Sequence, residues 1–239
     1  MRTKFKSFLN ERLSNYNVAK KIAFELGEEI NELLGEGSYG KAYSTKSGKV
    51  LKLTYGITEV NRAYVLSRNK NRTKYLINYY NVGKIVYDWS DEFDEINKGK
   101  DDYEKFEWYI LMDQVLPLTN NEFEALSNYM IYEFMMNIIH DKKINNFLNE
   151  YINYIKMYSK NETYIKNMTT TMIELYPHII NIAKELKKHH IISNFDFHAG
   201  NLGWNKDRTH LVFFDIGGNT KKDNYKRNNK KIIIDENEI

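Results

Sequence analysis

The chain has 239 residues, and its 35 basic residues nearly balance its 32 acidic ones, which leaves a net charge of +3. This length suits one two-lobed domain or two small ones, and the charge balance argues against a bulk nucleic-acid binder. The lack of cysteine excludes disulfides, thiolate metal sites and a cysteine nucleophile. No apolar run could span a bilayer and no signal peptide is recognisable, so we expect a cytoplasmic protein, in the host cytoplasm if it is viral, without a membrane partner.

The first segment is predicted to be helical over residues 3–27, because apolar residues recur at helical spacing and Gly27 can end the helix. These residues are Phe5, Phe8, Leu9, Leu13, Val18, Ile22 and Leu26. We expect an N-terminal helical extension over residues 1–29 that packs on the next domain.

The next region changes to short apolar stretches separated by turn residues, which is typical of antiparallel strands. The predicted strands are residues 29–34, 41–45, 50–54, 79–89 and 108–112. A single helix is expected from about Thr58, which would be its N-cap, and residues 90–105 form a polar, acidic loop. Residues 30–115 therefore predict a small, antiparallel β-rich domain with one helix.

The last region, residues 116–239, returns to helical spacing after Pro117. One helix is predicted through Phe123 and Ile138, and two more follow, marked by Ile144, Leu148, Ile152 and Ile155 and by Ile179, Ile182, Ala183 and Leu186. Two short strands follow at 201–204 and 210–214. A Lys- and Asn-rich tail begins at about Lys221. Within it, Ile232–Ile234 are expected to form a last strand. The fold class expected for the whole chain is α+β.

A glycine motif of the form G-x-G-x-x-G joins the first two predicted strands, at Gly35, Gly37 and Gly40. Glycines let a backbone approach phosphate oxygens closely. A dinucleotide-binding βαβ unit would need a helix directly after the glycines, whereas residues 41–45 continue as a strand. The motif favours a hairpin over nucleotide phosphates, with an ordinary glycine-containing turn as the alternative.

Lys52 stands in the middle of an apolar strand, where a buried ammonium needs a partner. The only acidic residue between Lys52 and Asp88 is Glu59, in the first turn of the predicted helix. The two residues together predict a lysine held on the α- and β-phosphates by a carboxylate. Alternatively, Glu59 only complements the helix dipole.

Three further residues, Asp196, Asn201 and Asp215, are separated by five and fourteen positions. Phosphoryl transfer needs an in-line nucleophile and cations on the developing negative charge, and Mg²⁺ prefers oxygen ligands. We therefore interpret Asp196 as the base, and Asn201 and Asp215 as magnesium ligands. His198 either bonds phosphate or the Asp196 loop, or is purely structural.

These motifs resemble the protein-kinase-like superfamily from about Ile30 to Gly217. The resemblance implies a bilobal fold, with a β-rich N-lobe, a mainly helical and truncated C-lobe, and ATP in the cleft between them. It implies that Ser38 and Ala42 line the nucleotide site beside the glycines. It also implies that Met112 is the gatekeeper and that Asp113 and Val115 belong to the hinge that contacts adenine.

The departures from typical protein kinases narrow the resemblance. Asn194-Phe195-Asp196 stands where those enzymes have His-Arg-Asp, and Asp215-Ile216-Gly217 replaces Asp-Phe-Gly. The form Asp-x-His-x-Gly-Asn is similar to that of aminoglycoside phosphotransferases, choline kinases and short kinase-like proteins of phages. Only 22 residues follow Gly217, which leaves no room for a full activation segment.

The sequence therefore predicts a kinase that uses ATP and Mg²⁺ to phosphorylate an unidentified hydroxyl acceptor, in the first place Ser or Thr of a protein. A small-molecule kinase of the aminoglycoside or choline type is one alternative. A pseudokinase-like binding module and a nucleotidyl transferase are the others.

Overall fold

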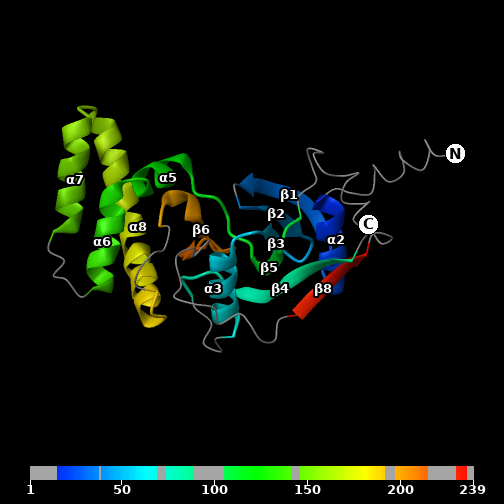
Figure 1. Ribbon diagram of the computed structural model, residues 1–239. Coiled ribbons are helices and arrows are strands. Elements are labelled where there is room, and N and C mark those ends of the chain that lie inside the picture. The colour runs from blue at the N-terminus through cyan, green and yellow to red at the C-terminus, as the bar shows by residue number, and fades with distance from the viewer. Residues whose placement is uncertain are drawn as a thin grey trace. The chain divides into compact units, whose positions relative to one another are not determined.

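The chain forms two compact units (Figure 1). The structure, a computed structural model, describes residues 15–37, 39–68, 74–88, 105–140, 146–191, 197–214 and 230–235. The first unit, called the β unit, comprises Met1–Lys70, Tyr79–Gln114 and Thr220–Ile239. The second, called the helical unit, comprises Asn71–Asn78 and Val115–Asn219. The predicted α+β class is confirmed.

A six-stranded sheet forms the β unit, in the order β1-β2-β3-β5-β4-β8. Its strands are β1 (Ile30–Gly37), β2 (Gly40–Thr45), β3 (Lys49–Thr54), β4 (Tyr79–Asp88), β5 (Trp108–Asp113) and β8 (Lys230–Asp235). Neighbouring strands are antiparallel, except that β8 runs parallel to β4. The five strands predicted before residue 115 are confirmed.

One face of this sheet is covered by helix α2 (Asn15–Glu25). Tyr43, Leu51 and Leu111 lie side by side in adjacent strands and share this face, where Ile22 of α2 is buried among them. The helix predicted over residues 3–27 is confirmed where it is described, and residues 3–14 lie outside the described part. Because the apolar side of α2 meets the apolar face of the sheet, this helix belongs to the core of the β unit.

Helix α3 (Ile57–Ser67) follows β3 and buries Glu59, Val60, Arg62 and Ala63. It begins one residue before the predicted N-cap Thr58, and its N-cap is Gly56. The reason lies in the preceding turn, where Thr54 Oγ1 accepts a hydrogen bond from the Gly56 N–H at 2.9 Å. This side chain closes the turn before the helix starts, so Thr58 is already helical.

Strand β8 corrects the assignment of residues 116–239 to one domain. A strand was expected near Ile232–Ile234, but it pairs with β4, from Gly83↔Lys230 to Asp88↔Asp235, and therefore belongs to the β unit. Ile232 and Ile234 are buried in the core beneath α2, whereas Ile233 between them points outward. The alternating burial of β-branched residues suits a strand with one covered face.

The helical unit contains four helices, a one-turn 3-10 helix and a small two-stranded sheet among its described residues. These are α5 (Asn120–Leu126), α6 (Tyr129–Ile139), α7 (Phe147–Tyr158), α8 (Glu162–Lys188), η1 (Ala199–Asn201), β6 (Leu202–Trp204) and β7 (Leu211–Phe213). The long helix α8 packs against α5, α6 and α7. It runs through Pro177 without ending there. The two short strands predicted after residue 200 are confirmed.

The single helix predicted through Phe123 and Ile138 is wrong, because the chain turns between α5 and α6. Ser127 is the C-cap of α5, and Asn128 is the N-cap of α6, where its side chain accepts a hydrogen bond from the Met130 N–H at 3.0 Å. Helical spacing continued across this break, so periodicity alone did not reveal it.

The helix α7 shows a smaller difference. Its buried residues are Phe147, Tyr151 and Ile155, whereas the prediction marked Leu148 and Ile152 as part of the apolar face. The tyrosine at position 151 supplies the buried ring that the aliphatic pattern did not include.

Within the described part of the chain, no helix combines the length and the apolar character needed to cross a bilayer.

Candidate functional site

The glycine motif forms the tip of the β1–β2 hairpin. Gly35 pairs with Ala42 and Gly37 with Gly40, so a strand follows the glycines directly. The helix that a dinucleotide-binding βαβ unit requires is therefore replaced by β2. Ser38 lies outside the described residues.

The glycines of the hairpin differ in what surrounds them. A Cβ atom at Gly40 would lie 2.1 Å from the carbonyl oxygen of Leu53, so the close approach of β3 requires glycine there. A Cβ atom at Gly35 or Gly37 would meet nothing within 4 Å. Packing therefore explains Gly40, whereas Gly35 and Gly37 leave open space beside the backbone, as a phosphate-binding strand would need.

Lys52 and Glu59 form an ion pair, as the sequence predicted. Lys52 Nζ lies 2.8 Å from Glu59 Oε1, and the two side chains are only 14% and 7% exposed. Strand β3 directs Lys52 onto the sheet face that Ala42 and Ile110 share, and the first turn of α3 brings Glu59 to it. Neither charge would be stable at this depth without the other.

Met112 and Asp113 end strand β5 in the β unit. Met112 is buried between Val50 of β3 and Tyr79 of β4, which are its partners in the sheet. The Asp113 carboxylate accepts a hydrogen bond from the hydroxyl of Tyr80. The gatekeeper and hinge roles that the resemblance assigns to Met112 and Asp113 stay predictions.

Val115 and Leu116 lie in the helical unit, beside strand β6. The Leu116 N–H donates to the carbonyl of Trp204 at 2.7 Å, and the Trp204 N–H donates back at 2.8 Å. A Cβ atom at Gly203 would lie 2.7 Å from Val115 Cγ2 and 2.8 Å from the Leu116 carbonyl oxygen. Glycine is thus needed at position 203 for this close packing.

His198 precedes the turn η1 and Asn201 is its last residue, in the segment that follows Asp196. The Nδ1 atom of His198 accepts the Gly200 N–H at 3.0 Å, and the carbonyl of His198 accepts the Asn201 N–H at 2.9 Å. His198 therefore caps the turn that places Asn201, and the Asn201 residue is buried. This contact supports the structural role that the sequence left open for His198.

A pair of contacts holds the segment after Asp196 against the segment before Asp215. The Asn201 carbonyl accepts a hydrogen bond from the Phe214 N–H at 3.0 Å, which continues the β6–β7 ladder. The rings of Phe197 and Phe213 lie 5.3 Å apart. Asp196 and Asp215 themselves are outside the described residues. In the chain, Asp196 directly precedes Phe197, and Asp215 directly follows Phe214.

Sequence reasoning missed the role of Glu122 in this region. Its Oε1 accepts from Trp204 Nε1 at 3.1 Å, and its Oε2 accepts the Thr119 N–H at 2.7 Å and lies 3.6 Å from Arg208 Nη2. Thr119 and Glu122 form a capping box at the start of α5. The pattern Thr-x-x-Glu was a readable signal for that box, although its link to Trp204 depends on the tertiary fold.

Among the described residues, no group of three or more His, Asp or Glu side chains could hold a metal ion. The predicted magnesium pair is one amide and one carboxylate, which is the kind of oxygen donor set that Mg²⁺ uses together with phosphate and water.

Similarity to known proteins is found among solved structures only. No protein-family model and no curated protein matches the sequence. Among solved structures, the chain is similar to the kinase domain of Mycobacterium tuberculosis PknI, at 12% identity and a TM-score of 0.36 over 81% of this chain. It is also similar to Rad53 1–466 in complex with AMP-PNP, at 13% identity and a TM-score of 0.34 over 79% of this chain. The chain covers 60% of the first structure and 37% of the second. The functional interpretation therefore rests on this chain's own residues.

Proposed function

We propose that the protein is a phosphotransferase that moves the γ-phosphate of ATP to a hydroxyl group with the help of Mg²⁺. The observation that carries the proposal is the buried ion pair of Lys52 and Glu59, 2.8 Å apart. Replacing a buried ion pair by apolar residues often costs no stability. The presence of an ion pair at this depth therefore indicates that the ammonium has a function.

Lys52 is the proposed ligand of the ATP phosphates. Its ammonium has three N–H donors, one of which is directed to Glu59. Glu59 holds the ammonium in place. A Cβ atom at Gly35 or Gly37 would meet nothing within 4 Å. This open space beside the backbone would allow phosphates to lie close to the hairpin.

Asn201 and Asp215 are the proposed magnesium ligands, and their amide and carboxylate oxygens fit that ion. When bound, Mg²⁺ supplies positive charge against the phosphate oxygens. The contribution of the chain is positional: the hydrogen bond between Asn201 and Phe214 keeps the residue before Asp215 adjacent to Asn201. His198 supports the same arrangement by capping the η1 turn.

Asp196 is the proposed base. In the reaction, the acceptor oxygen bonds to the γ-phosphorus, the bond from that phosphorus to the bridging oxygen breaks, and ADP leaves. The hydroxyl proton of the acceptor passes to the Asp196 carboxylate. We propose a protein Ser or Thr as the acceptor, by analogy with the phage kinase-like proteins. The loop Asp196–Asn201 also favours a small-molecule hydroxyl as a second candidate.

The test is to incubate the purified protein with ATP labelled at either the α- or the γ-phosphate. We expect γ-label to be transferred and α-label to stay in ADP. Asp196→Asn and Asp215→Asn should lower transfer by about a hundredfold or more, since each removes a group that acts on the reacting atoms. Asp207→Asn, a carboxylate on the exposed turn after β6, is the matched control and should transfer at the wild-type rate.

The acceptor is identified in the same assay, with one arm containing mixed Ser and Thr peptides and another containing small alcohols and amino sugars. Label in the peptides supports the first candidate, and label in the small molecules supports the second. Transfer of the α-label would show nucleotidyl transfer instead. ATP binding without loss of the γ-phosphate in any arm would contradict the proposal and favour a binding module.

A further inference from the structure

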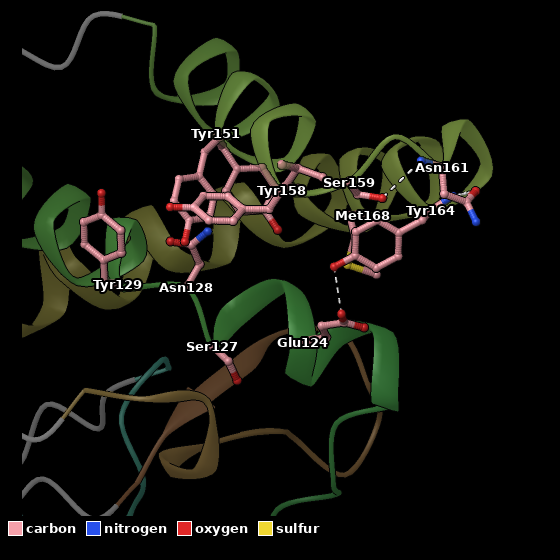
Figure 2. A pocket seen from close by; sticks show the side chains of 12 residues that line it. Glu124, Ser127, Asn128, Tyr129, Tyr151, Tyr158, Ser159, Asn161, Tyr164 and Met168 are labelled. Carbon is pink, nitrogen blue, oxygen red and sulfur yellow. Dashed lines mark hydrogen bonds between the residues drawn. The ribbon is translucent and has the colours of Figure 1, made fainter.

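A tyrosine-lined pocket of about 680 Å³ lies in the helical unit and is not lined by His198 or Asn201. It is bounded by the α5–α6 junction, by α7 and by the start of α8 (Figure 2). Five of its lining residues are tyrosines: Tyr129, Tyr151, Tyr154, Tyr158 and Tyr164. Its volume is within the range of small-ligand pockets.

Charge in the pocket has one sign. The only ionic side chain of the lining is Glu124, and Lys156 and Lys160, although close in sequence, are not part of it. Glu124 Oε1 accepts the hydroxyl of Tyr164 at 2.7 Å, and Oε2 has no side-chain partner among the described residues. The hydrogen bond to Glu124 raises the pKa of Tyr164, so the phenol stays neutral.

The aromatic rings are arranged as an exposed cluster. Tyr154 lies 5.8 Å from Tyr129 and 4.7 Å from Tyr158, measured between ring centroids. Tyr129 and Tyr158 are 61% and 74% exposed, whereas Tyr151 is buried at the base and donates its hydroxyl to the Ala125 carbonyl. Packing of the core does not require the exposed rings, and grouped exposed aromatic residues are typical of recognition surfaces.

Tyrosines elsewhere in the chain show what such rings attract. The cations of Lys20, Lys49 and Arg68 lie 4.6, 4.8 and 4.5 Å from the ring centroids of Tyr16, Tyr80 and Tyr64. Among the described residues, no lysine or arginine lies over a ring of the pocket. The pocket therefore offers aromatic faces and a carboxylate oxygen that the described side chains leave open to a cation from outside.

We propose that this pocket binds an organic cation, an ammonium or guanidinium group held against the tyrosine rings and paired with Glu124. The same chemistry is offered by a free amine and by a lysine or arginine side chain of a protein. Binding does not depend on phosphotransfer, so this inference and the proposed function can fail separately.

The experiment uses the full chain labelled with ¹³C in its methionine methyl groups, because Met168 lines the pocket. The Met168 resonance is identified with Met168→Leu. The cations are tetramethylammonium and the tripeptide Gly-Arg-Gly, and their neutral counterparts are tert-butanol and Gly-citrulline-Gly. We expect saturable shifts of the Met168 signal with the cations and none with the neutral compounds.

Variants define the contributing groups. Tyr158→Leu and Glu124→Gln should each weaken cation binding by about three- to tenfold, which is the size of a partly exposed cation–π or ionic contact. Tyr158→Phe keeps the ring, and Glu133→Gln removes an exposed carboxylate of α6 outside the pocket, so both should bind normally. Because Tyr158 is mostly exposed, its substitution leaves the fold intact even if Glu124→Gln does not.

Tighter binding of the tripeptide would identify a protein side chain as the source of the cation, and tighter binding of tetramethylammonium a free amine. Either result supports the proposal. Equal responses to cations and neutral compounds would overturn it, as would unchanged affinity in both Tyr158→Leu and Glu124→Gln.

Discussion

The ammonium of Lys52 lies 2.8 Å from the carboxylate of Glu59, and the pair joins strand β3 to the first turn of helix α3. Seven residues separate the two in sequence. The strand, the turn closed by Thr54 and the early start of α3 bring them together on one face of the sheet.

Breaking this pair from one side should destabilise the β unit. We expect Glu59→Ala or Lys52→Ala alone to lower the free energy of unfolding by about 3–5 kcal/mol, because each leaves a buried charge without its partner. The double variant Lys52→Met/Glu59→Leu should lose much less. Urea denaturation of the three variants measures this, with the exposed pair Lys46–Glu29 as control, where loss is about 0–1 kcal/mol. A double variant that loses as much free energy of unfolding as the two single variants together would contradict a coupled pair.

Two glycines of the hairpin should respond differently to alanine. Gly40→Ala should lower the free energy of unfolding by about 1–3 kcal/mol, because the added Cβ would overlap the Leu53 carbonyl. Gly35→Ala has space for a Cβ and should unfold like the wild type, within about 0.5 kcal/mol. If phosphates bind at the hairpin, Gly35→Ala should still weaken ATP binding, which calorimetric titration measures. Equal stability of the two variants would show that the hairpin does not pack as described.

The C-terminal strand offers a matched test of its attachment to the β unit. Ile234 is fully buried beneath α2, and the adjacent Ile233 is 56% exposed. Ile234→Ala should lower the free energy of unfolding by about 2–5 kcal/mol, as expected for a core isoleucine. Ile233→Ala should change it by less than about 0.5 kcal/mol. Chemical denaturation compares them, and similar small effects of both would mean that β8 does not complete the core.

The histidines His178 and His210 predict a loss of stability in mild acid. Burial is the main cause that lowers the pKa of both histidines. At His178, the charges of His210 and Lys74 lower the pKa further. At His210, the charge of Lys74 lowers it further, whereas a hydrogen bond to the Lys74 backbone and the charge of Asp207 oppose the shift. Because the folded-state pKa is lowered, these histidines bind protons more readily in the unfolded chain. Their contribution to the free energy of unfolding is therefore fully present above about pH 6.5 and is lost as the pH falls below that value.

The measurement is urea denaturation at pH 7.5 and at pH 5.5. We expect the wild type to lose stability between them, and the variant His178→Gln/His210→Gln to lose less. The substitution His140→Gln, at an exposed histidine that ends α6, should leave the wild-type pH dependence unchanged. A double variant with the same pH dependence as the wild type would exclude the two histidines as its source.

Local patterns in the sequence predicted much of the fold and the ion pair of Lys52 and Glu59. The first five strands were readable because short β-branched and aromatic stretches end at turn residues. The ion pair was readable because Lys52 stood in an apolar strand and Glu59 was the only acid near it. Periodicity failed where a side chain interrupted it, as Asn128 did between α5 and α6, and where Tyr151 replaced an aliphatic residue on the buried face of α7.

Contacts distant in the chain were not readable in this way. Nothing near Ile232–Ile234 indicates that β4 is its partner, because sheet pairing depends on an edge formed more than a hundred residues earlier. The bond from Trp204 to Glu122 and the gathering of tyrosines from three helices likewise need the assembled fold.

The sequence by itself determined the residues of the proposed phosphotransfer site, because spacing along a strand, a turn or a helix start is a local property. Only the tertiary structure decided that α2 and β8 complete the core of the β unit, that Gly40 and Gly203 are required by close packing, and that Glu124 faces a cluster of tyrosines. Those features arise from burial and from contacts between distant segments, whose free energy appears only when the chain folds.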